Sequence, residues 1–510
     1  MPEYKGSVFW QYITLNKAAT PDKAFIRYRD HQVTWRRLFE LGEILWEQMS
    51  DENADILVIP AREDNLPQYV LVAACLVNRI PFVLSHIEDV EQDAVIQSAC
   101  QLSKPCKITI DALGEAVWCS ACMMVSSVEL HQSDQQDGAL LLPAWSDVIY
   151  VGRSSGTTGI PKLVPVTARS FDDFLPEVLT RFPLKDSDVM GDFAQMPSDM
   201  TITNLILCLA ANATWVPLCT IRDRMMLFNS FSQHGVTCFR SVASSLNFIN
   251  ACISRGMSLP DTFKWFCFGG ERLTWQALSL VFESNLKAQV FNSFGATELA
   301  GFVTLGEVKP EGLDQRELVH QSISDDVEIG PFFDDVKYSF HARQSLHLTS
   351  ARFPHYFIQV TGGKAEWRKW RQTGNGQSII ATGDQVVIDN NQLFVTGRTD
   401  SLIKLKGQFI NIENEEYAVY KATGLKCLIH INDADLTLFF RQQDSDEVQL
   451  KLASVRTAIA HLGLQLSYHF VDQFPETPSG KIQRRLLPQK PLDDDEEDEM
   501  LSRKFSSLGK

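Results

Sequence analysis

Residues 148–162, VIYVGRSSGTTGIPK, decide the fold expected of this chain. The first four residues form an apolar run that predicts a buried strand, and the strand leads into a loop at 154–162 with four hydroxyl residues, two glycines, a proline and a lysine. Backbone N–H groups of such a loop can converge on phosphate oxygens. The Walker A spacing is absent. A flexible Ser/Gly linker is the alternative, but a strand before the loop and Pro-Lys after it favour a phosphate-binding loop.

Strands and helices alternate around this loop. The spacing of apolar residues predicts helices over 38–49 and 66–78, and short buried strands over 54–60 and 80–84. This alternation indicates an α/β fold with mainly parallel strands. A chain of 510 residues exceeds a single core, so we expect at least two domains, with a boundary at the polar turn Gly397–Asp400. Residues 306–378 show no clean period.

Composition excludes several classes of function. A net charge of −16 argues against a broad nucleic-acid-binding surface and against an anionic membrane surface. Residues 200–221 carry no charge, but polar side chains and Pro217 interrupt them, so we expect a buried helix and strand and no membrane span. Eleven scattered cysteines without a secretory signal favour a reduced, cytoplasmic protein. The pair Cys119 and Cys122 is a weak indication of a metal or redox site, and the acidic run at 492–499 predicts a solvated tail.

Further motifs follow the loop in a fixed order. They are Gly269–Glu271 (GGE), Asn292–Glu298 (NSFGATE), Ala381–Asp384 (ATGD), Gly397–Gly407 (GRTDSLIKLKG) and Pro475–Arg485 (PETPSGKIQRR). Together with the loop, this set resembles the adenylate-forming superfamily of acyl-CoA synthetases, adenylation domains of nonribosomal peptide synthetases, and luciferase. The resemblance runs from about residue 10 to 485. It implies a large N-terminal α/β domain of several subdomains (1–397), a hinge (398–400), a small mobile C-terminal α/β domain (401–485) and an acidic tail (486–510).

The resemblance also assigns roles to individual residues. Lys481 would bridge the substrate carboxylate and the α-phosphate, Thr297 would donate to phosphate oxygens, and Glu298 would hold Mg2+. The nucleotide-binding residues that it implies are Ser154, Ser155, Gly156, Thr157, Thr158, Gly159, Lys162, Gly269, Gly270, Glu271, Asn292, Ser293, Phe294, Gly295, Asp384 and Arg398. A carboxylate such as Asp384 can clamp two ribose hydroxyls. Taken alone, Glu298 could form an exposed salt bridge, Asp384 an Asx turn, and Lys481 would pass for a surface lysine.

The substrate acid has its own candidate residues. Residues 163–218 resemble amino-acid adenylation domains more than fatty-acyl synthetases, which implies that Asp199 holds a substrate α-ammonium. The alternative is that Asp199 is the N-cap of the uncharged helix that follows. The acid pocket would be lined by residues near the adenine motifs, namely Cys267, Phe268 and Ser293. The hinge position would be Asp400, and the thiol tunnel would include Gly407.

The resemblance therefore implies an AMP-forming carboxylate ligase that uses ATP and Mg2+. It would convert a carboxylic acid, favoured to be an amino acid, to an acyl-adenylate, release pyrophosphate, and load the phosphopantetheine thiol of a carrier protein in trans. The alternatives are an acyl- or aryl-CoA ligase that uses coenzyme A, and a non-catalytic nucleotide-binding homologue that serves as an interaction module. Departures from the family pattern bear on the thioester step: Ala168 replaces a frequent histidine, Leu163 a glycine, and Asn414 and Glu415 an apolar-Gly pair.

Overall fold

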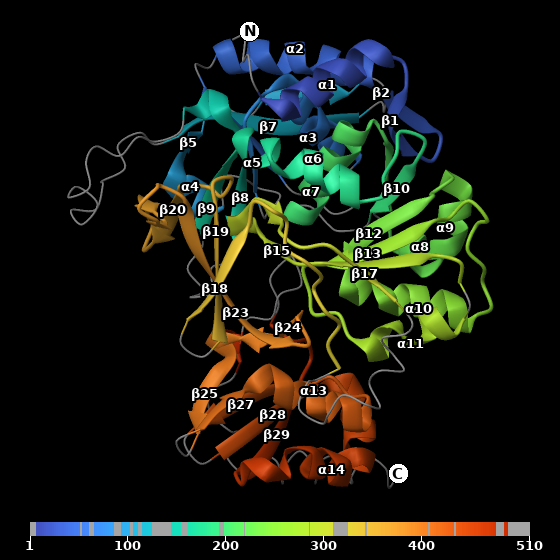
Figure 1. Cartoon of the computed structure of the whole chain (residues 1–510), viewed down its shortest axis with the longest axis vertical. Coiled ribbons are helices and arrows are strands. Elements are labelled where there is room, and N and C mark those ends of the chain that lie inside the picture. Colours follow the sequence, from blue (N-terminus) through green and yellow to red (C-terminus); the bar gives the residue numbers. More distant parts are fainter. Residues whose placement is uncertain are drawn as a thin grey trace, which may run out of the picture. The chain divides into compact units, whose positions relative to one another are not determined.

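The computed structural model describes residues 7–51, 54–60, 66–85, 93–102, 106–110, 115–124, 144–154, 162–192, 198–218, 220–284, 286–309, 325–341, 344–405, 408–432, 435–475 and 484–487. The chain forms two compact units, Met1–Thr396 and Gly397–Lys510 (Figure 1). In the described part, no helix combines the length and apolarity that crossing a membrane requires.

An eight-stranded sheet carries several of the predicted motifs. Its strand order is β17-β14-β13-β12-β10-β11-β1-β2, with β1 (Ala24–Tyr28), β2 (His31–Thr34), β10 (Val189–Asp192), β11 (Thr214–Pro217), β12 (Cys238–Val242), β13 (Trp265–Gly269), β14 (Gln289–Ser293) and β17 (Gly306–Val308). Strands β10 to β14 run parallel, and Val242, Gly269 and Ser293 lie in register at their ends. The carboxyl ends of these strands therefore share one edge, where ligands bind in open α/β sheets.

A nine-stranded sheet carries the glycine loop. It contains β3 (Ile56–Pro60), β4 (Phe82–Ser85), β5 (Cys100–Leu102), β6 (Cys106–Ile110), β7 (Glu115–Met124), β8 (Val148–Ser154), β9 (Lys162–Thr167), β20 (Tyr356–Thr361) and β21 (Lys364–Lys369). Strands β3, β4 and β8 are parallel, and β8 pairs antiparallel with β9 up to Ser154 and Lys162. The pairing brings together the two residues that flank the part of the loop outside the described residues.

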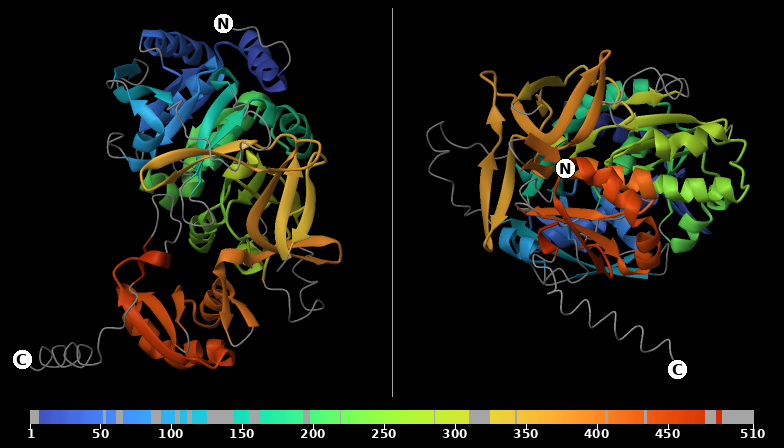
Figure 2. Two further views of the ribbon diagram at one scale, coloured as in Figure 1. Left: turned by 90° about the vertical axis from the view of Figure 1, so that its left-hand side faces the viewer. Right: turned by 90° about the horizontal axis from the view of Figure 1, so that it is seen from below.

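Two buried helices join the sheets. Helix α7 (Asp199–Ala211) packs on β10 and β11, helix α3 (Leu66–Asn78) packs on β3 and β7, and the two helices contact each other. Every residue of α3 is buried, as are Thr201–Ala210 of α7. Helices surrounded by protein are apolar all round, which explains the uncharged stretch at 200–221 and confirms the predicted helix followed by a strand. Helices α1 (Val8–Ala19) and α2 (Trp35–Asp51) lie at the N-terminal end of this unit (Figures 1 and 2).

The described part of the region without a clean period, residues 306–309, 325–341 and 344–378, contains strands and no α-helix. It contains β18 (Lys337–His341), β19 (Ser345–Ser350) and β22 (Arg371–Gln372), together with β20 and β21, and it is followed by β23 (Ser378–Asp389) and β24 (Gln392–Arg398). All five residues of β18 are exposed, and β19 alternates partly buried with buried positions. Short strands with a solvated face carry too little apolar alternation to be recognised in sequence.

The second unit has a core of its own. Strands β27 (Leu428–Asn432), β28 (Asp435–Arg441) and β29 (Gln465–Val471) form a sheet beside α13 (Ile412–Thr423) and α14 (Ser445–Ile459), and β25 (Leu402–Leu405) pairs with β26 (Gln408–Asn411). Val419, Leu438 and Val455 are among its fully buried residues. The predicted turn at Gly397–Asp400 begins later than expected, because β24 continues to Arg398 and a 3-10 turn occupies Thr399–Ser401. The hinge at 398–400 and the tail at 486–510 stay predictions.

Candidate active site

Three segments distant in sequence meet at the end of β8. The Ser154 hydroxyl donates to Glu298 Oε1 at 2.6 Å, and the Thr297 hydroxyl donates to Asp199 Oδ2. Thr297 and Glu298 begin a 3-10 turn, η6 (Thr297–Leu299), and Asp199 begins α7. The structure thus brings the edge of the glycine loop, the NSFGATE motif and the candidate ammonium-binding residue into one site.

Gly152 makes this approach possible. A β-carbon at this position of β8 would lie 2.7 Å from Thr297 Cγ2 and 3.1 Å from Asp199 Oδ1. The sequence analysis missed Gly152, although a glycine inside an apolar strand is a known indication that another segment approaches closely. Only a residue without a side chain fits between β8 and the Thr297–Asp199 pair.

Asp199 is a carboxylate in a poorly solvated position. Burial raises the pKa of Asp199 to about 7; the hydrogen bond from Thr297 opposes this shift, and the negative charge of Glu298 adds to it. Burial and the charge of Asp199 raise the pKa of Tyr150 well above its ordinary value. The alternative role for Asp199 is wrong, because Ser198 is the N-cap and its hydroxyl accepts from Met200 N at 3.2 Å. An ammonium group bound at Asp199 would favour the ionised carboxylate.

A short hairpin shapes the turn that carries Thr297 and Glu298. Strand β15 (Gly295–Ala296) pairs with β16 (Gly301–Phe302), and a β-carbon at Gly295 would lie 2.3 Å from the Gly301 carbonyl oxygen. Between the strands, Ala300 takes a left-handed conformation with φ of 54°. The glycine of the NSFGATE motif is therefore a requirement of backbone packing.

The GGE and NSFGATE motifs meet at the shared strand edge. A β-carbon at Gly269 would lie 2.4 Å from Ser293 Oγ, and the Ser293 hydroxyl donates to the Phe268 carbonyl at 3.1 Å. Gly270 has φ of +73° and lies against Met200, the residue after Asp199. Both motifs therefore border the start of α7.

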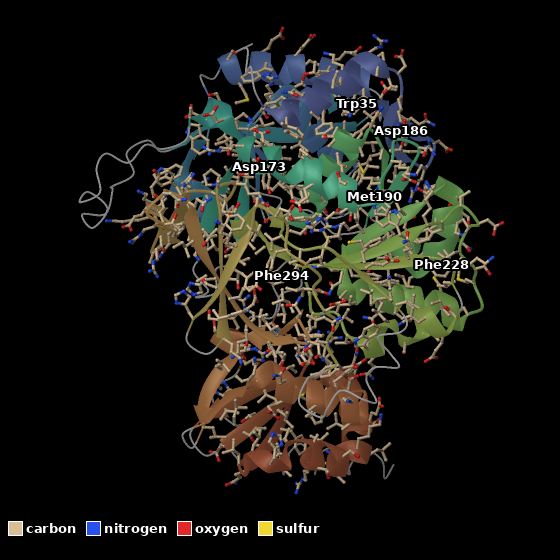
Figure 3. All side chains as sticks on the ribbon, viewed as in Figure 1. Trp35, Asp173, Asp186, Met190, Phe228 and Phe294 are labelled. Atoms are coloured by element: carbon tan, nitrogen blue, oxygen red, sulfur yellow. The ribbon has the colours of Figure 1, made fainter. Side chains whose placement is uncertain are left out.

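Three residues of these motifs take part in hydrogen bonds in which one of the two groups is a backbone group. Glu271 accepts from Ser244 N at 2.7 Å, the Asn292 amide donates to the Glu328 carbonyl at 2.8 Å, and Phe294 N donates to Thr304 Oγ1 at 3.1 Å. In the view of Figure 3, Phe294 lies between the eight-stranded sheet and a further sheet that is formed by β18, β19, β22, β23 and β24. The roles of these residues toward a nucleotide stay predictions.

Two of the residues predicted to line the acid pocket lie on opposite faces of β13. Cys267 lies in the core that contains α7, with its sulfur 3.8 Å from Ser293 Oγ. Phe268 points to the other face and packs in a different apolar cluster, where it stacks on Phe266. Phe268 can therefore contribute only its backbone, which accepts the Ser293 hydroxyl, to the face that holds Cys267.

Arg240 is a second residue that the sequence analysis missed. This residue of β12 is 3% exposed, and its guanidinium donates to Asn204 Oδ1 at 2.6 Å and to Ser293 Oγ at 3.5 Å. It also lies 4.6 Å from the Phe302 ring centroid. The charge of Arg240 lowers the pKa of Cys267, against a larger rise caused by burial. Nothing in the local sequence distinguishes Arg240 from a surface arginine.

Asp384 lies in β23, where the chain bulges. Gly383 has φ of +78°, and the Thr382 hydroxyl donates to the Leu346 carbonyl and accepts from Asp384 N, both at 3.1 Å. The Thr382 hydroxyl thus supports the backbone of this turn on both sides, and the Asx-turn alternative for Asp384 stays a prediction. Asp384 itself is 9% exposed. Its contact with ribose stays a prediction.

The structure describes the surroundings of Lys162 and of two departures from the family pattern, Leu163 and Ala168. The Lys162 ammonium lies 5.1 Å from the Trp370 ring centroid and 5.5 Å from that of Phe357. Leu163 is fully buried in β9, where it pairs with Arg153 and Ile358, so a leucine fits there as a core residue. Ala168 precedes α5 (Arg169–Asp172) and is nearly buried.

Several predicted residues cannot be placed in the site. Those outside the described residues are Ser155, Gly156, Thr157, Thr158, Gly159, Lys481 and Gly407, and the same holds for the side chain of Asp400. Arg398 belongs to the second unit. The side chains of Cys119 and Cys122 also lie outside the description, whereas six other cysteines are free and buried.

Glu298 is the residue that suits a magnesium ion. The described residues contain no cluster of three or more His, Cys, Asp or Glu side chains that could hold a metal. Mg2+ keeps several waters and binds through one or two carboxylates together with substrate phosphates, so a single carboxylate beside the Ser154 hydroxyl fits this ion better than a closed cage would.

The class of protein follows from comparison with known families. Residues 64–324, just over half of the chain, match the AMP-binding enzyme family, and the chain belongs to this family. This result confirms the superfamily resemblance. The chain is accordingly an AMP-forming carboxylate ligase.

The chain is similar in sequence to two ligases of the same name. The chain is 27% identical to a D-alanine–D-alanyl carrier protein ligase of Bacillus licheniformis, over 67% of this chain and 70% of the relative. It is 23% identical to the ligase of the same name from Bacillus anthracis, over 92% and 96%.

Solved structures share the predicted two-domain α/β fold. The o-succinylbenzoate CoA synthetase of Bacillus subtilis, in complex with its acyl-adenylate intermediate, is 15% identical, with a TM-score of 0.67 over 94% of this chain and 98% of that one. The Vibrio cholerae adenylation domain AlmE, in complex with glycyl-adenosine-5′-phosphate, is 14% identical, with a TM-score of 0.55 over 98% and 99%. The fold is therefore that of adenylate-forming enzymes.

Proposed function

We propose that this protein activates a small amino acid, with D-alanine as the first candidate, and transfers it to the phosphopantetheine thiol of a carrier protein in trans. The observation that carries the amino-acid assignment is the Asp199 carboxylate, which the Thr297 hydroxyl orients beside the glycine loop. A substrate α-ammonium would form a charge-assisted hydrogen bond with it. The names of the two Bacillus ligases supply the candidate amino acid and the carrier protein.

The first step is attack by the substrate carboxylate on the α-phosphate of ATP, with loss of pyrophosphate. The carboxylate is ionised at neutral pH, so no general base is needed, and the site must position the reactants and stabilise charge. In the structure, the Ser154 and Thr297 hydroxyls donate to carboxylates. Both would turn toward phosphate oxygens when ATP binds, joined by Thr157 and Thr158.

Two further residues complete the proposed site. Glu298 would hold Mg2+, which offsets the charge of the phosphates. Lys481 would bridge the substrate carboxylate and the α-phosphate, and its movement with the second unit would open the way for the thiol. We also assign the protein to the cytoplasm, because the six described cysteines that are free and buried suit a reducing compartment.

Substrate-dependent pyrophosphate exchange tests this proposal. We expect exchange with small amino acids and none with aryl or fatty acids. Exchange with aryl or fatty acids alone would favour the CoA-ligase alternative, and the absence of exchange with any acid would favour the non-catalytic nucleotide-binding alternative. Supplying a phosphopantetheinylated carrier protein or coenzyme A as the acceptor distinguishes the two thiols by product analysis.

Lys481→Ala is the sharpest single variant for the mechanism. We expect it to lower exchange at least about 100-fold, because the transition-state charge loses its bridging cation, while ATP affinity changes little. Exchange kinetics and calorimetric ATP titration measure the two effects. Near-normal exchange in this variant would refute the assignment.

A further inference from the structure

The turn that carries Thr297 and Glu298 has backbone groups that need buried partners. It leaves β15 and returns through the left-handed residues Ala300 (φ 54°) and Gly301 (φ 115°) into β16. The carbonyl oxygens of Leu299 and Phe302, one on either side of this reversal, point to the same neighbour. Buried carbonyls without donors cost free energy, so the shape of the turn depends on that neighbour.

The neighbour is Arg352, which follows β19. Its Nη1 donates to the Leu299 carbonyl at 3.3 Å, its Nη2 donates to the Phe302 carbonyl at 3.2 Å, and its Nε donates to Asp335 Oδ2 at 2.9 Å. The side chain is fully buried. A guanidinium fork can satisfy three acceptors in fixed directions, which the ammonium of a lysine cannot do.

Further contacts with Ser350, Asp335 and two aromatic rings fix the orientation of the Arg352 side chain. The Ser350 hydroxyl donates to the same Asp335 oxygen and accepts from Arg352 N at 3.2 Å. The guanidinium carbon lies 5.0 Å from the Phe174 ring centroid and 5.4 Å from that of Phe353. These contacts leave the fork little freedom to rotate.

We propose that Arg352 is a positioning residue for the adenylation step, because it sets the turn that carries Thr297 and Glu298 to the end of β8. It acts through the Leu299 and Phe302 carbonyls and touches no reacting atom. The inference rests on the proposed function, since Thr297 and Glu298 must serve adenylation for their position to matter. A displacement of about 1 Å in such a group can cost about 100-fold in rate.

The experiment is amino-acid-dependent pyrophosphate exchange in Arg352→Lys. We expect kcat to fall about 10- to 100-fold with the KM for ATP within about threefold of the wild-type value. Asp188→Asn is the matched control, because it also removes the charge of a buried carboxylate. Asp188 lies before β10, at the other edge of the sheet, and bonds to Thr237 before β12 and to Lys264 before β13. If both variants lose similar thermal stability and only Arg352→Lys loses kcat, general destabilisation is excluded.

A double-mutant cycle separates positioning from mere folding. In a background that carries both Thr297→Ala and Glu298→Gln, Arg352→Lys should lower the residual kcat by about threefold or less, since both groups that it positions are already gone. A full 10- to 100-fold loss in that background, or a kcat for Arg352→Lys within about twofold of wild type, would overturn the inference. Asp335→Asn, which keeps the fork and loses one of its anchors, should show the same kinetics to a smaller degree if Arg352→Lys fails to fold.

The outcomes for the two proposals are distinct. Wild-type protein that exchanges with no acid overturns the proposed function and this inference with it. Wild-type protein that exchanges with amino acids, beside an Arg352→Lys variant of unchanged kcat, overturns only the role of Arg352.

Discussion

The two edges of the eight-stranded sheet differ in the partners that they provide for charged side chains. At the amino ends of the parallel strands, Asp188 forms an ion pair with Lys264 and accepts from the Thr237 hydroxyl at 2.9 Å. At the carboxyl ends, among the described residues, Asp199 accepts from Thr297 and faces no cation, and Arg240 contacts an amide, a hydroxyl and a ring but no carboxylate. The edge that holds the Asp188–Lys264 ion pair supports the fold. At the other edge, Asp199 and Arg240 keep their charges without an ion pair among the described residues, which costs stability, as is typical of functional sites.

The largest expected effect comes from removing the charge of Asp199. We expect Asp199→Asn to lower kcat/KM for the amino acid by about 30- to 5,000-fold, the equivalent of the 2–5 kcal/mol lost when one partner of a buried charge pair is removed. The same variant should unfold at a higher temperature than wild type at pH 8, since a poorly solvated charge is gone. Exchange kinetics and calorimetry measure the two changes. A variant that loses both activity and stability would place Asp199 with the structural charges of the opposite edge.

The pH dependence of substrate binding should follow Asp199. Its pKa of about 7 means that the carboxylate becomes protonated as the pH falls below neutrality, so the KM for the amino acid should rise about tenfold per pH unit well below 7. The KM measured from pH 5 to 8 shows whether this occurs. In Asp199→Asn the KM should be flat over this range, and a wild-type profile that is equally flat would contradict the pairing of Asp199 with an ammonium.

Stability should depend on pH through the same group. The folded pKa of Asp199 lies above its ordinary value of 3.8, so the native state binds the proton more tightly, and this contribution is lost as the pH rises from about 4 to 7. The loss is roughly 4 kcal/mol at most. Denaturant unfolding at pH 5 and pH 8 tests this direction. The free energy of unfolding of the wild type should be higher at pH 5, and the difference between the two pH values should be smaller in Asp199→Asn.

An intermediate effect is expected where β8 approaches the site. Gly152→Ala should lower kcat about tenfold and stability by about 1–3 kcal/mol, because its β-carbon would meet Thr297 and displace it from Asp199. Gly374→Ala is the matched control, since no heavy atom lies within 4 Å of a β-carbon at that position and its φ is ordinary. Kinetics and unfolding curves that are the same for both variants would show that β8 tolerates a side chain there.

The smallest effect on activity is expected at the amino ends of the parallel strands of the eight-stranded sheet. Asp188→Asn should lower the free energy of unfolding by about 1–3 kcal/mol, since Lys264 is partly solvated, with kcat and KM for the amino acid within about twofold of wild type. Urea unfolding and exchange kinetics measure these quantities. A large loss of activity at unchanged stability would remove the contrast between the two edges.

Much of the fold and part of the site could be predicted because their signals are local. The helix at 66–78, the strand at 148–151 and the buried helix followed by a strand at 200–221 each show in a short window of apolar spacing. The β-rich region after residue 337 could not be predicted, since short strands with one solvated face have a weak period. Local sequence does not distinguish Ser198, the observed N-cap, from Asp199, because either residue type can cap a helix.

By itself, the sequence determined the class of chemistry. Contiguous motifs such as residues 154–162 and 292–298 bring together glycines, hydroxyls and a carboxylate whose spacing along the chain already indicates phosphate binding. Only the tertiary structure decided how Thr297 meets Asp199, why β8 needs Gly152, and which buried arginine holds the turn. These contacts join residues that are about 50 to 150 positions apart, and the pleat and pairing of two sheets, which no local pattern encodes, bring them together.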